Sequence, residues 1–272
     1  MKIKFQKINS DDYYLSYSGG RDSHFLYWFI RHYLCDTDIA IVSVNTYMEH
    51  HEILNRMRKY SDIMLLPKLK PKEIKQKYGI PCFSKSQDEF IRRYQSGSRA
   101  ASTMKRVARL ESSMFNLNKR ASELTLNGKL HRVSRKCCDF LKKEPAKRYE
   151  KATGKKAILG VRMSEGILRK SRYTSCFTKD RTFTPIFDLS DELLNAIYEK
   201  YEIEVPEIYN TLKRTGCMGC PYSIHHSNIQ EEFKLLSENQ LAFVTDYFKE
   251  SYEVLGIEVE SVDEESRGKD NE

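Results

Sequence analysis

The segment Ser-Gly-Gly-Arg-Asp-Ser at positions 18–23 constrains the fold most, because it joins two stretches of different character. Residues 13–18 (Tyr-Tyr-Leu-Ser-Tyr-Ser) are rich in residues that favour strands. Residues 24–34 are apolar nearly all round, which is typical of a buried helix. We therefore predict a strand, a sharp turn and a helix within residues 13–34.

The turn has the composition of a phosphate-binding loop. Its two glycines let the backbone turn sharply and expose N–H groups, its serines add hydroxyl donors, and its arginine adds a fixed positive charge. The N-terminus of the following helix adds the positive end of a dipole. We expect the loop to hold a phosphate or pyrophosphate group through Ser18, Gly19, Gly20, Arg21 and Ser23, with Asp22 positioning the loop or a metal ion.

Strands and helices alternate beyond the loop. Residues 39–46, 63–66 and 156–162 are predicted strands, and 49–60 is a predicted helix. This alternation predicts an α/β fold, a Rossmann-like open parallel sheet with helices on both faces, extended by a basic helical insertion and a helical metal-binding C-terminal segment. The predicted parts are a nucleotide-binding domain (1–90 and 150–190), the insertion (91–149), the C-terminal helices (191–258) and a disordered acidic tail (259–272).

The net charge of +8 is unevenly distributed along the chain. Residues 91–172 hold 23 Lys or Arg and 6 Asp or Glu, whereas the rest of the chain holds 23 and 32. A basic block of this density indicates either a solvated helical surface or a polyanionic partner. No apolar run approaches the ~18 residues of a membrane helix, and the N-terminus lacks the apolar core of a signal peptide. We expect a cytoplasmic protein without membrane contact.

Four of the seven cysteines form two close pairs, Cys137-Cys138 and Cys217-x-x-Cys220. An odd cysteine count without a secretion signal argues against a disulfide framework. A C-x-x-C turn can place two thiolates on one metal, and a second pair can complete a four-thiolate site for zinc or an iron–sulfur cluster. Cys35, in an apolar predicted helix, is expected in the core.

These motifs together resemble those of one family. The 18–23 loop looks like the PP-loop of N-type ATP pyrophosphatases, and more narrowly that of the phosphoadenosine-phosphosulfate (PAPS) reductase family, in which lysine usually stands in place of Arg21. Residues 45–49 (Asn-Thr-Tyr-Met-Glu) resemble the family's adenosine-pocket segment, and residues 160–169 resemble its nucleotide- and anion-contacting segment. Residues 214–221 (Arg-Thr-Gly-Cys-Met-Gly-Cys-Pro) resemble its C-terminal cysteine segment, whereas residues 98–130 match no motif.

The resemblance implies a site for an adenine nucleotide, with ATP and Mg²⁺ as the expected ligands. Besides the loop, it assigns to the nucleotide Thr46, Glu49, Gly160, Arg162, Glu165 and Arg169. It also implies that the cysteine pairs hold a [4Fe–4S] cluster, with zinc as the alternative. Because related phage-type members carry a cysteine at the position of Cys176, the candidate ligands are Cys137, Cys138, Cys176, Cys217 and Cys220.

Two departures from the family's reductases bear on the predicted reaction. No cysteine follows Cys220, so the tail nucleophile of those enzymes is missing unless Cys82 or Cys176 replaces it, and the PP-loop is nearly intact. We therefore predict an enzyme that binds ATP–Mg²⁺ and adenylates an acceptor for sulfur transfer, with release of pyrophosphate and with Asp22 and Arg21 as catalytic residues.

The partners follow from the same interpretation. The expected acceptor is a nucleic acid, tRNA or DNA, bound by the basic 91–172 block, with a sulfur-donor protein as a further partner. The sequence is compatible with an oligomer. Two alternatives stay open: a sulfonucleotide reductase with a non-standard nucleophile, and a non-catalytic protein that binds nucleotide or nucleic acid.

Overall fold

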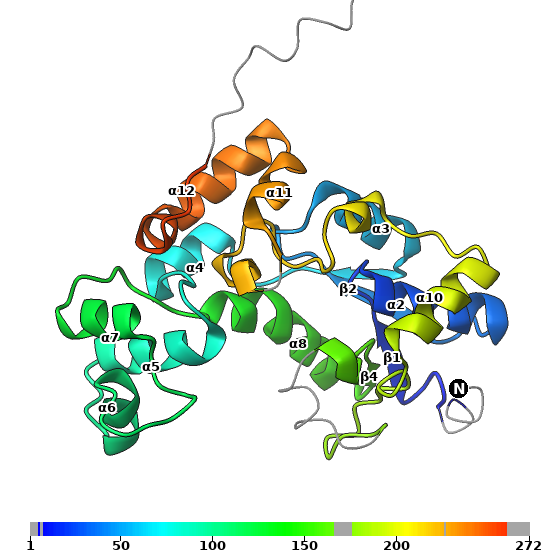
Figure 1. Cartoon of the computed structure of the whole chain (residues 1–272). Helices are drawn as coiled ribbons and strands as arrows, with labels where there is room; N and C mark the ends of the chain where they lie inside the picture. Colours follow the sequence, from blue (N-terminus) through cyan, green and yellow to red (C-terminus); the bar gives the residue numbers. More distant parts are fainter. Residues whose placement is uncertain (1–4, 6–7, 166–175, 226, 260–272) are drawn as a thin grey trace, which may run out of the picture. The chain divides into compact units, whose positions relative to one another are not determined.

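A computed structural model describes residues 5, 8–165, 176–225 and 227–259 (Figure 1). The chain divides into two compact units. Unit 1 comprises Met1–Gly79 and Arg135–Met218, and unit 2 comprises Ile80–Ser134 and Gly219–Glu272. In the described ranges, none of the helices combines the length and the apolar character that crossing a membrane requires.

Unit 1 is built on a four-stranded sheet in which all strand pairs are parallel. The strands are β1 (Tyr13–Ser16), β2 (Ala40–Val44), β3 (Ile63–Leu65) and β4 (Lys156–Ile158). Their order in the sheet is β3-β2-β1-β4, so the direction of winding reverses between β1 and β4. The predicted open parallel α/β sheet is therefore confirmed. β4 is shorter than predicted and ends at Ile158, and the chain leaves the sheet before Gly160.

Both faces of the sheet are covered by helices. Successive side chains of a strand point to opposite faces, and on one face Leu15 packs into a large apolar cluster with residues of the helices α2, α3 and α10. On the other face Tyr14 packs with Val42, and its ring lies 4.9 Å from that of Tyr149 on α8. The helices of unit 1 are α2 (Arg21–Trp28), α3 (His51–Tyr60), α4 (Pro71–Tyr78), α8 (Glu144–Thr153) and α10 (Asp191–Lys200), with the π-helices η1 (Phe29–Tyr33) and η2 (Cys138–Lys143).

Unit 2 is helical in its described part and contains both the end of the CxxC segment and most of the insertion. Its helices are α5 (Lys85–Gln95), α6 (Ala101–Val107), α7 (Lys119–Leu126), α11 (Ile229–Lys234) and α12 (Glu238–Leu255), with a 3-10 turn, η5 (Pro221–His225). The buried carboxylate of Asp88 joins two parts of the unit, because it accepts hydrogen bonds from the Cys82 and Phe83 N–H groups and from the Tyr222 hydroxyl at 2.6 Å.

Side-chain caps explain where several helices begin. Ser84, Asn118 and Ser237 each accept a hydrogen bond from a backbone N–H of the following turn. Within the region predicted to be helical (191–258), residues 207–210 form only a 3-10 turn, η4 (Glu207–Asn210), that follows Pro206. Proline fixes its own φ and lacks a donor, which suits the start of such a turn.

Candidate functional site

The predicted phosphate loop lies at the point where the sheet reverses its winding. The loop follows β1, and residues 159–162 follow β4, its neighbour in the sheet. Ligands of open parallel sheets bind beyond the carboxyl ends of the strands at such a point. A Cβ on Gly160 would lie 2.9 Å from the Asp22 carbonyl carbon and from the Ser23 nitrogen, so only glycine fits beside the loop. The structure thus brings Gly160 to the loop residues.

The loop holds its own shape. Gly19 has a φ of +73°, which glycine adopts readily, and Gly20 is the extended residue that precedes α2. The Ser23 hydroxyl donates to the Gly20 carbonyl at 2.9 Å and accepts from the Ser18 N–H at 3.2 Å. The hydroxyl oxygens of Ser18 and Ser23 are 3.1 Å apart. The two serines therefore fix the turn that presents the N-terminus of α2.

Arg21 is engaged by α10. Its guanidinium donates to the Asn195 side-chain oxygen and lies over the Tyr198 ring, 5.1 Å from the ring centroid. The Tyr198 hydroxyl donates to the Arg21 carbonyl at 2.6 Å. A role of Arg21 in gripping pyrophosphate stays a prediction, and it requires the side chain to exchange these partners for the phosphate.

Arg162 and Asp22 form a nearly buried ion pair beside the loop. The Arg162 Nε donates to Asp22 Oδ1 at 2.8 Å, and its Nη1 donates to Asp191 Oδ1 at 2.6 Å. The hydrogen bond from Arg162 holds the pKa of Asp191 below its ordinary value. Arg162 and Asp22 were both predicted at the nucleotide site from the sequence. Glu165 ends the short turn η3 (Met163–Glu165), and Arg169 lies outside the described residues.

The segment that leads to the cysteines covers the start of α2. The Tyr209 hydroxyl accepts the Arg21 N–H at 3.0 Å, and the same hydroxyl is 3.1 Å from Thr215 Oγ1. A Cβ on Gly20 would lie 3.0 Å from that hydroxyl, so a side chain there would require Tyr209 to shift by a few tenths of an ångström. Tyr209 was not among the predicted site residues, and no local motif signals its place.

Thr46 and Glu49 lie in a tight turn after β2. Thr46 Oγ1 donates to Glu49 Oε1 at 2.7 Å and accepts the Met48 N–H at 3.2 Å. The Met48 carbonyl accepts the Met218 N–H at 2.8 Å, which joins this turn to the CxxC segment. The residues predicted to line the adenosine pocket are thus in contact with the segment that carries Cys217.

Cys138, Cys217, Glu49 and Lys142 form one electrostatic group in unit 1. Lys142 shares a side-chain hydrogen bond with Cys217 and interacts with the charges of Cys138 and Glu49. Burial raises the pKa of the Cys217 thiol to about 11, and the Lys142 ammonium opposes that rise. Cys138 and Lys142 lie four positions apart on the π-helix η2, and π-helical turns occur frequently at functional sites. The sequence analysis counted Lys142 only as part of the basic block.

The other cysteines have different surroundings. Cys176 packs against the apolar core of unit 1, and Cys220 is half-buried in unit 2. Cys82 is fully buried, and desolvation raises the pKa of its thiol. Cys35 is exposed, so its predicted core position was wrong; it follows the π-helix η1, where the helix ends.

Among the described residues, no three His, Cys, Asp or Glu side chains are close enough together to bind one metal ion.

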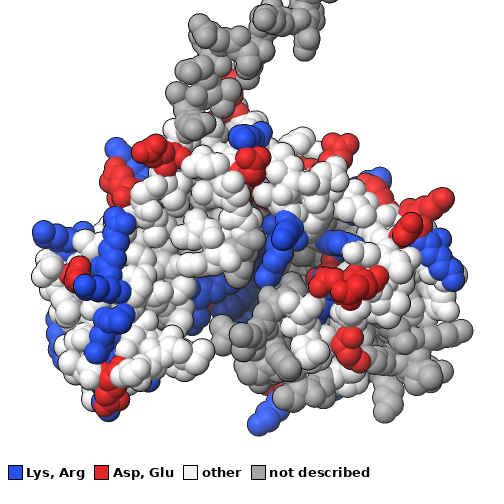
Figure 2. All heavy atoms as spheres, viewed as in Figure 1, with Lys and Arg blue, Asp and Glu red and all other residues white. Residues whose placement is uncertain are grey.

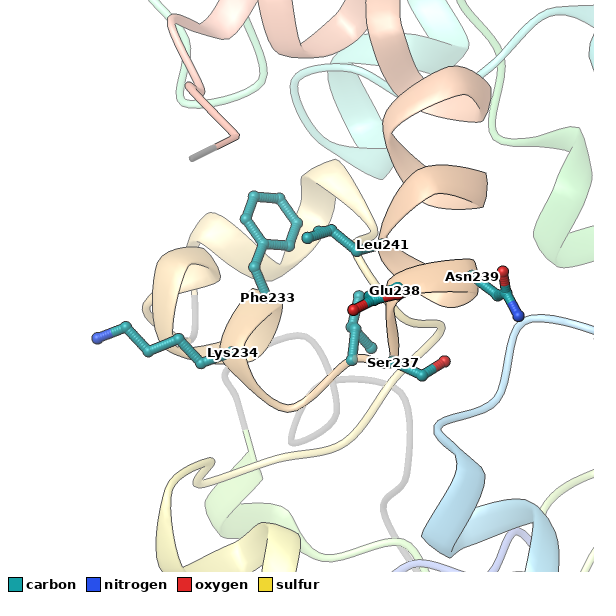
Figure 3. Close-up of a pocket in the computed structure, with 7 residues that line it drawn as sticks. Phe233, Lys234, Ser237, Glu238, Asn239 and Leu241 are labelled. Atoms are coloured by element: carbon teal, nitrogen blue, oxygen red, sulfur yellow. The ribbon is translucent and has the colours of Figure 1, made fainter. Parts of the chain in front are cut away.

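A pocket of about 470 Å³ lies in unit 2 where α11 meets the start of α12 (Figure 3). Its lining includes Phe233 and Leu241 together with Lys234 and Glu238. None of the residues predicted from the sequence lines it, so it plays no part in the proposed nucleotide site.

Comparison with known proteins gives likenesses to solved structures alone. No protein-family model matches the chain, and no curated protein matches it. Among solved structures, the chain is similar to the crystal structure of phosphoadenylyl-sulfate (PAPS) reductase from Candida auris in complex with phosphate. The two share 12% sequence identity with a TM-score of 0.42, over 76% of this chain and 86% of that chain. At these values the likeness carries no inference about the reaction.

Proposed function

We propose that the chain is an enzyme that binds ATP–Mg²⁺ at the 18–23 loop, adenylates an acceptor and couples this step to sulfur chemistry at the cysteines. One observation supports this proposal most. Residues 214–218 contact the phosphate loop through Thr215 and Tyr209, and they place Cys217 beside Lys142 and Cys138. A nucleotide at the loop and a thiol would therefore share one edge of unit 1.

The loop would hold the pyrophosphate part of ATP. The N-terminus of α2 offers backbone donors and the positive end of its dipole, and Ser18 and Ser23 add hydroxyl groups next to it. In the reaction the acceptor's nucleophile forms a bond to the α-phosphorus, and the bond from that phosphorus to the bridging oxygen breaks. The bridging oxygen keeps the electron pair as pyrophosphate leaves, and the loop stabilises this charge.

Two of the candidate cysteine ligands in unit 1 share a positively charged neighbour. Cys138 and Cys217 lie beside the Lys142 ammonium, which opposes the larger effect of burial on the pKa of the Cys217 thiol. Cys137 directly precedes Cys138 in the sequence, whereas Cys176 packs in the apolar core, which favours Cys137 over Cys176 as a further ligand within unit 1. A bound [4Fe–4S] cluster would supply sulfur or electrons at this place. Zinc stays the alternative.

The nucleotide proposal is tested by ATP binding and pyrophosphate release. We expect Ser18→Ala and Ser23→Ala to weaken ATP binding in equilibrium dialysis, because each removes a hydroxyl from the loop. The exposed Ser96 lies in unit 2, and Ser96→Ala serves as the matched control. Equal ATP binding by all three variants and the wild type would show that the loop is not the nucleotide site.

The metal proposal is tested separately by anaerobic purification. We expect absorbance near about 400 nm and bound iron and sulfide, with both lost in Cys138→Ser and Cys217→Ser. Cys35→Ser and Cys82→Ser are the controls, because one cysteine is exposed and the other lies in a different core. If the purified wild-type protein is colourless and contains zinc, the iron–sulfur assignment is wrong and the site is a structural zinc site.

Sulfonucleotide reduction is the second candidate. Cys82 is buried, whereas Cys217 places a thiol in the same group as Glu49 and Lys142. This candidate predicts that adenylyl sulfate and a thiol reductant yield sulfite and AMP without any ATP. Sulfite release that is lost in Cys217→Ser, together with no pyrophosphate release, would favour it over adenylation.

A further inference from the structure

Unit 2 carries a dense positive charge on its part of the predicted insertion. Residues 91–134 contain 10 Lys or Arg and 2 Asp or Glu. Lys and Arg side chains gather on the part of the viewed face that α5, α6 and α7 occupy in Figure 1 (Figure 2). Charge of this density on one compact part of a unit attracts polyanions.

The connection between α6 and α7, residues 109–117, exposes large apolar side chains within this charge. Leu110 is 66% exposed, Met114 85% and Phe115 46%. Hydrogen bonds close the connection at its base. The Leu117 N–H donates to the Arg106 carbonyl at 3.2 Å, the Asn116 amide donates to the Glu111 carbonyl at 2.6 Å, and Arg109 donates to the Leu117 carbonyl. The apolar side chains are thus presented to solvent by a fixed loop.

Cations flank the same loop. The Arg106 guanidinium lies 6.0 Å from the centroid of the Phe115 ring. Lys119 and Arg120 are exposed in the first turn of α7, although cations at a helix N-terminus are opposed by the helix dipole. Their position does not stabilise the helix locally, which favours a role toward an outside partner.

We propose that loop 109–117 and the first turn of α7 bind a nucleic acid through unpaired bases. Lys119, Arg120 and Arg106 would contact phosphates, while Phe115, Leu110 and Met114 would contact base faces. Proteins commonly hold single-stranded nucleic acids with aromatic side chains that lie among cations. A membrane surface is bound by the continuous apolar face of a helix, and the short, charged loop 109–117 does not form such a face. The inference rests on the proposed function, for which it names the acceptor and the surface that binds it.

Fluorescence anisotropy with labelled RNA and DNA strands of about 16 nucleotides tests the proposal. We expect Phe115→Ala to weaken single-strand binding about tenfold, with an unchanged salt slope. Lys119→Ala combined with Arg120→Ala should reduce the slope of log K against log salt by about 1.4, since each single-strand phosphate contact contributes about 0.7. The control is Lys234→Ala with Lys249→Ala, which removes the same charge from exposed positions in unit 2 outside the insertion.

The outcomes are distinct. If the control and the Lys119/Arg120 variant lose the same amount of oligonucleotide affinity, the attraction is diffuse and the assigned surface is wrong. If the protein binds anionic vesicles but no oligonucleotides, the partner is not a nucleic acid. Urea unfolding of each variant separates lost binding from lost folding. Wild-type protein that binds oligonucleotides but not ATP would leave this inference intact and reject the proposed function, and the reverse result would reject only this inference.

Discussion

Arg162 donates a hydrogen bond from Nε to Asp22 Oδ1 at 2.8 Å, across 140 positions of sequence. The pair joins the segment after β4 to the first turn of α2, and the arginine side chain is 8% exposed. A second bond from Arg162 reaches Asp191 at the start of α10. One guanidinium thus ties together three segments that surround the phosphate loop.

We expect Arg162→Met to destabilise unit 1 by about 3 kcal/mol, because it leaves the largely buried Asp22 carboxylate without its cation. Asp22→Asn in the same background should recover part of this loss, with a coupling of about 1–3 kcal/mol in a double-mutant cycle. Urea unfolding of the four proteins measures the coupling. Additive losses would show that the pair contributes no interaction energy of its own.

Gly160→Ala is expected to destabilise the protein by about 1–3 kcal/mol and to weaken ATP binding, because the new methyl group would meet the backbone of Asp22 and Ser23 at 2.9 Å. Gly216→Ala is the matched control, since nothing lies within 4 Å of its added Cβ. Thermal unfolding and equilibrium dialysis provide the measurements. A Gly160→Ala protein as stable as Gly216→Ala would contradict the close approach of residue 160 to the loop.

The sequence alone predicted the local parts of this site. Strand-forming residues, the Gly-Gly pair and the apolar stretch after it identify the strand, loop and helix, because each depends on neighbours in the chain. The pairing of Arg162 with Asp22 could not be predicted in this way, since it depends on β4 lying beside β1. The stacking of Arg21 on Tyr198 and the place of Tyr209 depend likewise on tertiary packing.

Lys142 illustrates the same limit at the cysteines. Its charge was counted in the basic block, where composition gives every lysine the same weight. Its spacing of four from Cys138 on a helix was the available signal, because residues four apart share a helix face. Only the fold shows that this face meets Cys217 and Glu49.

Asp88 should make unit 2 less stable as the pH rises. Burial raises the pKa of its carboxyl to about 6 from the ordinary 3.8. Because the folded pKa lies above the unfolded one, the stability it contributes is present below pH ~3.8 and is lost as the pH rises to about 6, an effect on the order of 3 kcal/mol. Asp88→Asn should lower the overall stability but remove this slope in urea unfolding.

Tyr222→Phe is the control for Asp88. The Tyr222 hydroxyl donates to the carboxylate and lowers its pKa, so its removal should extend the pH window upward. If the wild type and Asp88→Asn show parallel pH profiles, the carboxyl does not titrate in this window.

His24 should give unit 1 the opposite dependence. Its ring is buried, Tyr17 Oη lies 2.9 Å from its Nδ1, and desolvation, aided by Arg56, lowers the pKa of the imidazole to about 3. Because the folded pKa lies below the unfolded 6.5, the stability is present above pH ~6.5 and is lost at about 1.4 kcal/mol per pH unit as the pH falls toward 3. His24→Gln should remove this slope, and the His24 ring resonances in NMR should stay those of the neutral form at pH 5.

Hydrogen exchange read separately for the two units should then show protection rising with pH around His24 and falling with pH around Asp88. A protonated His24 ring at pH 5 in the folded protein would reject the prediction.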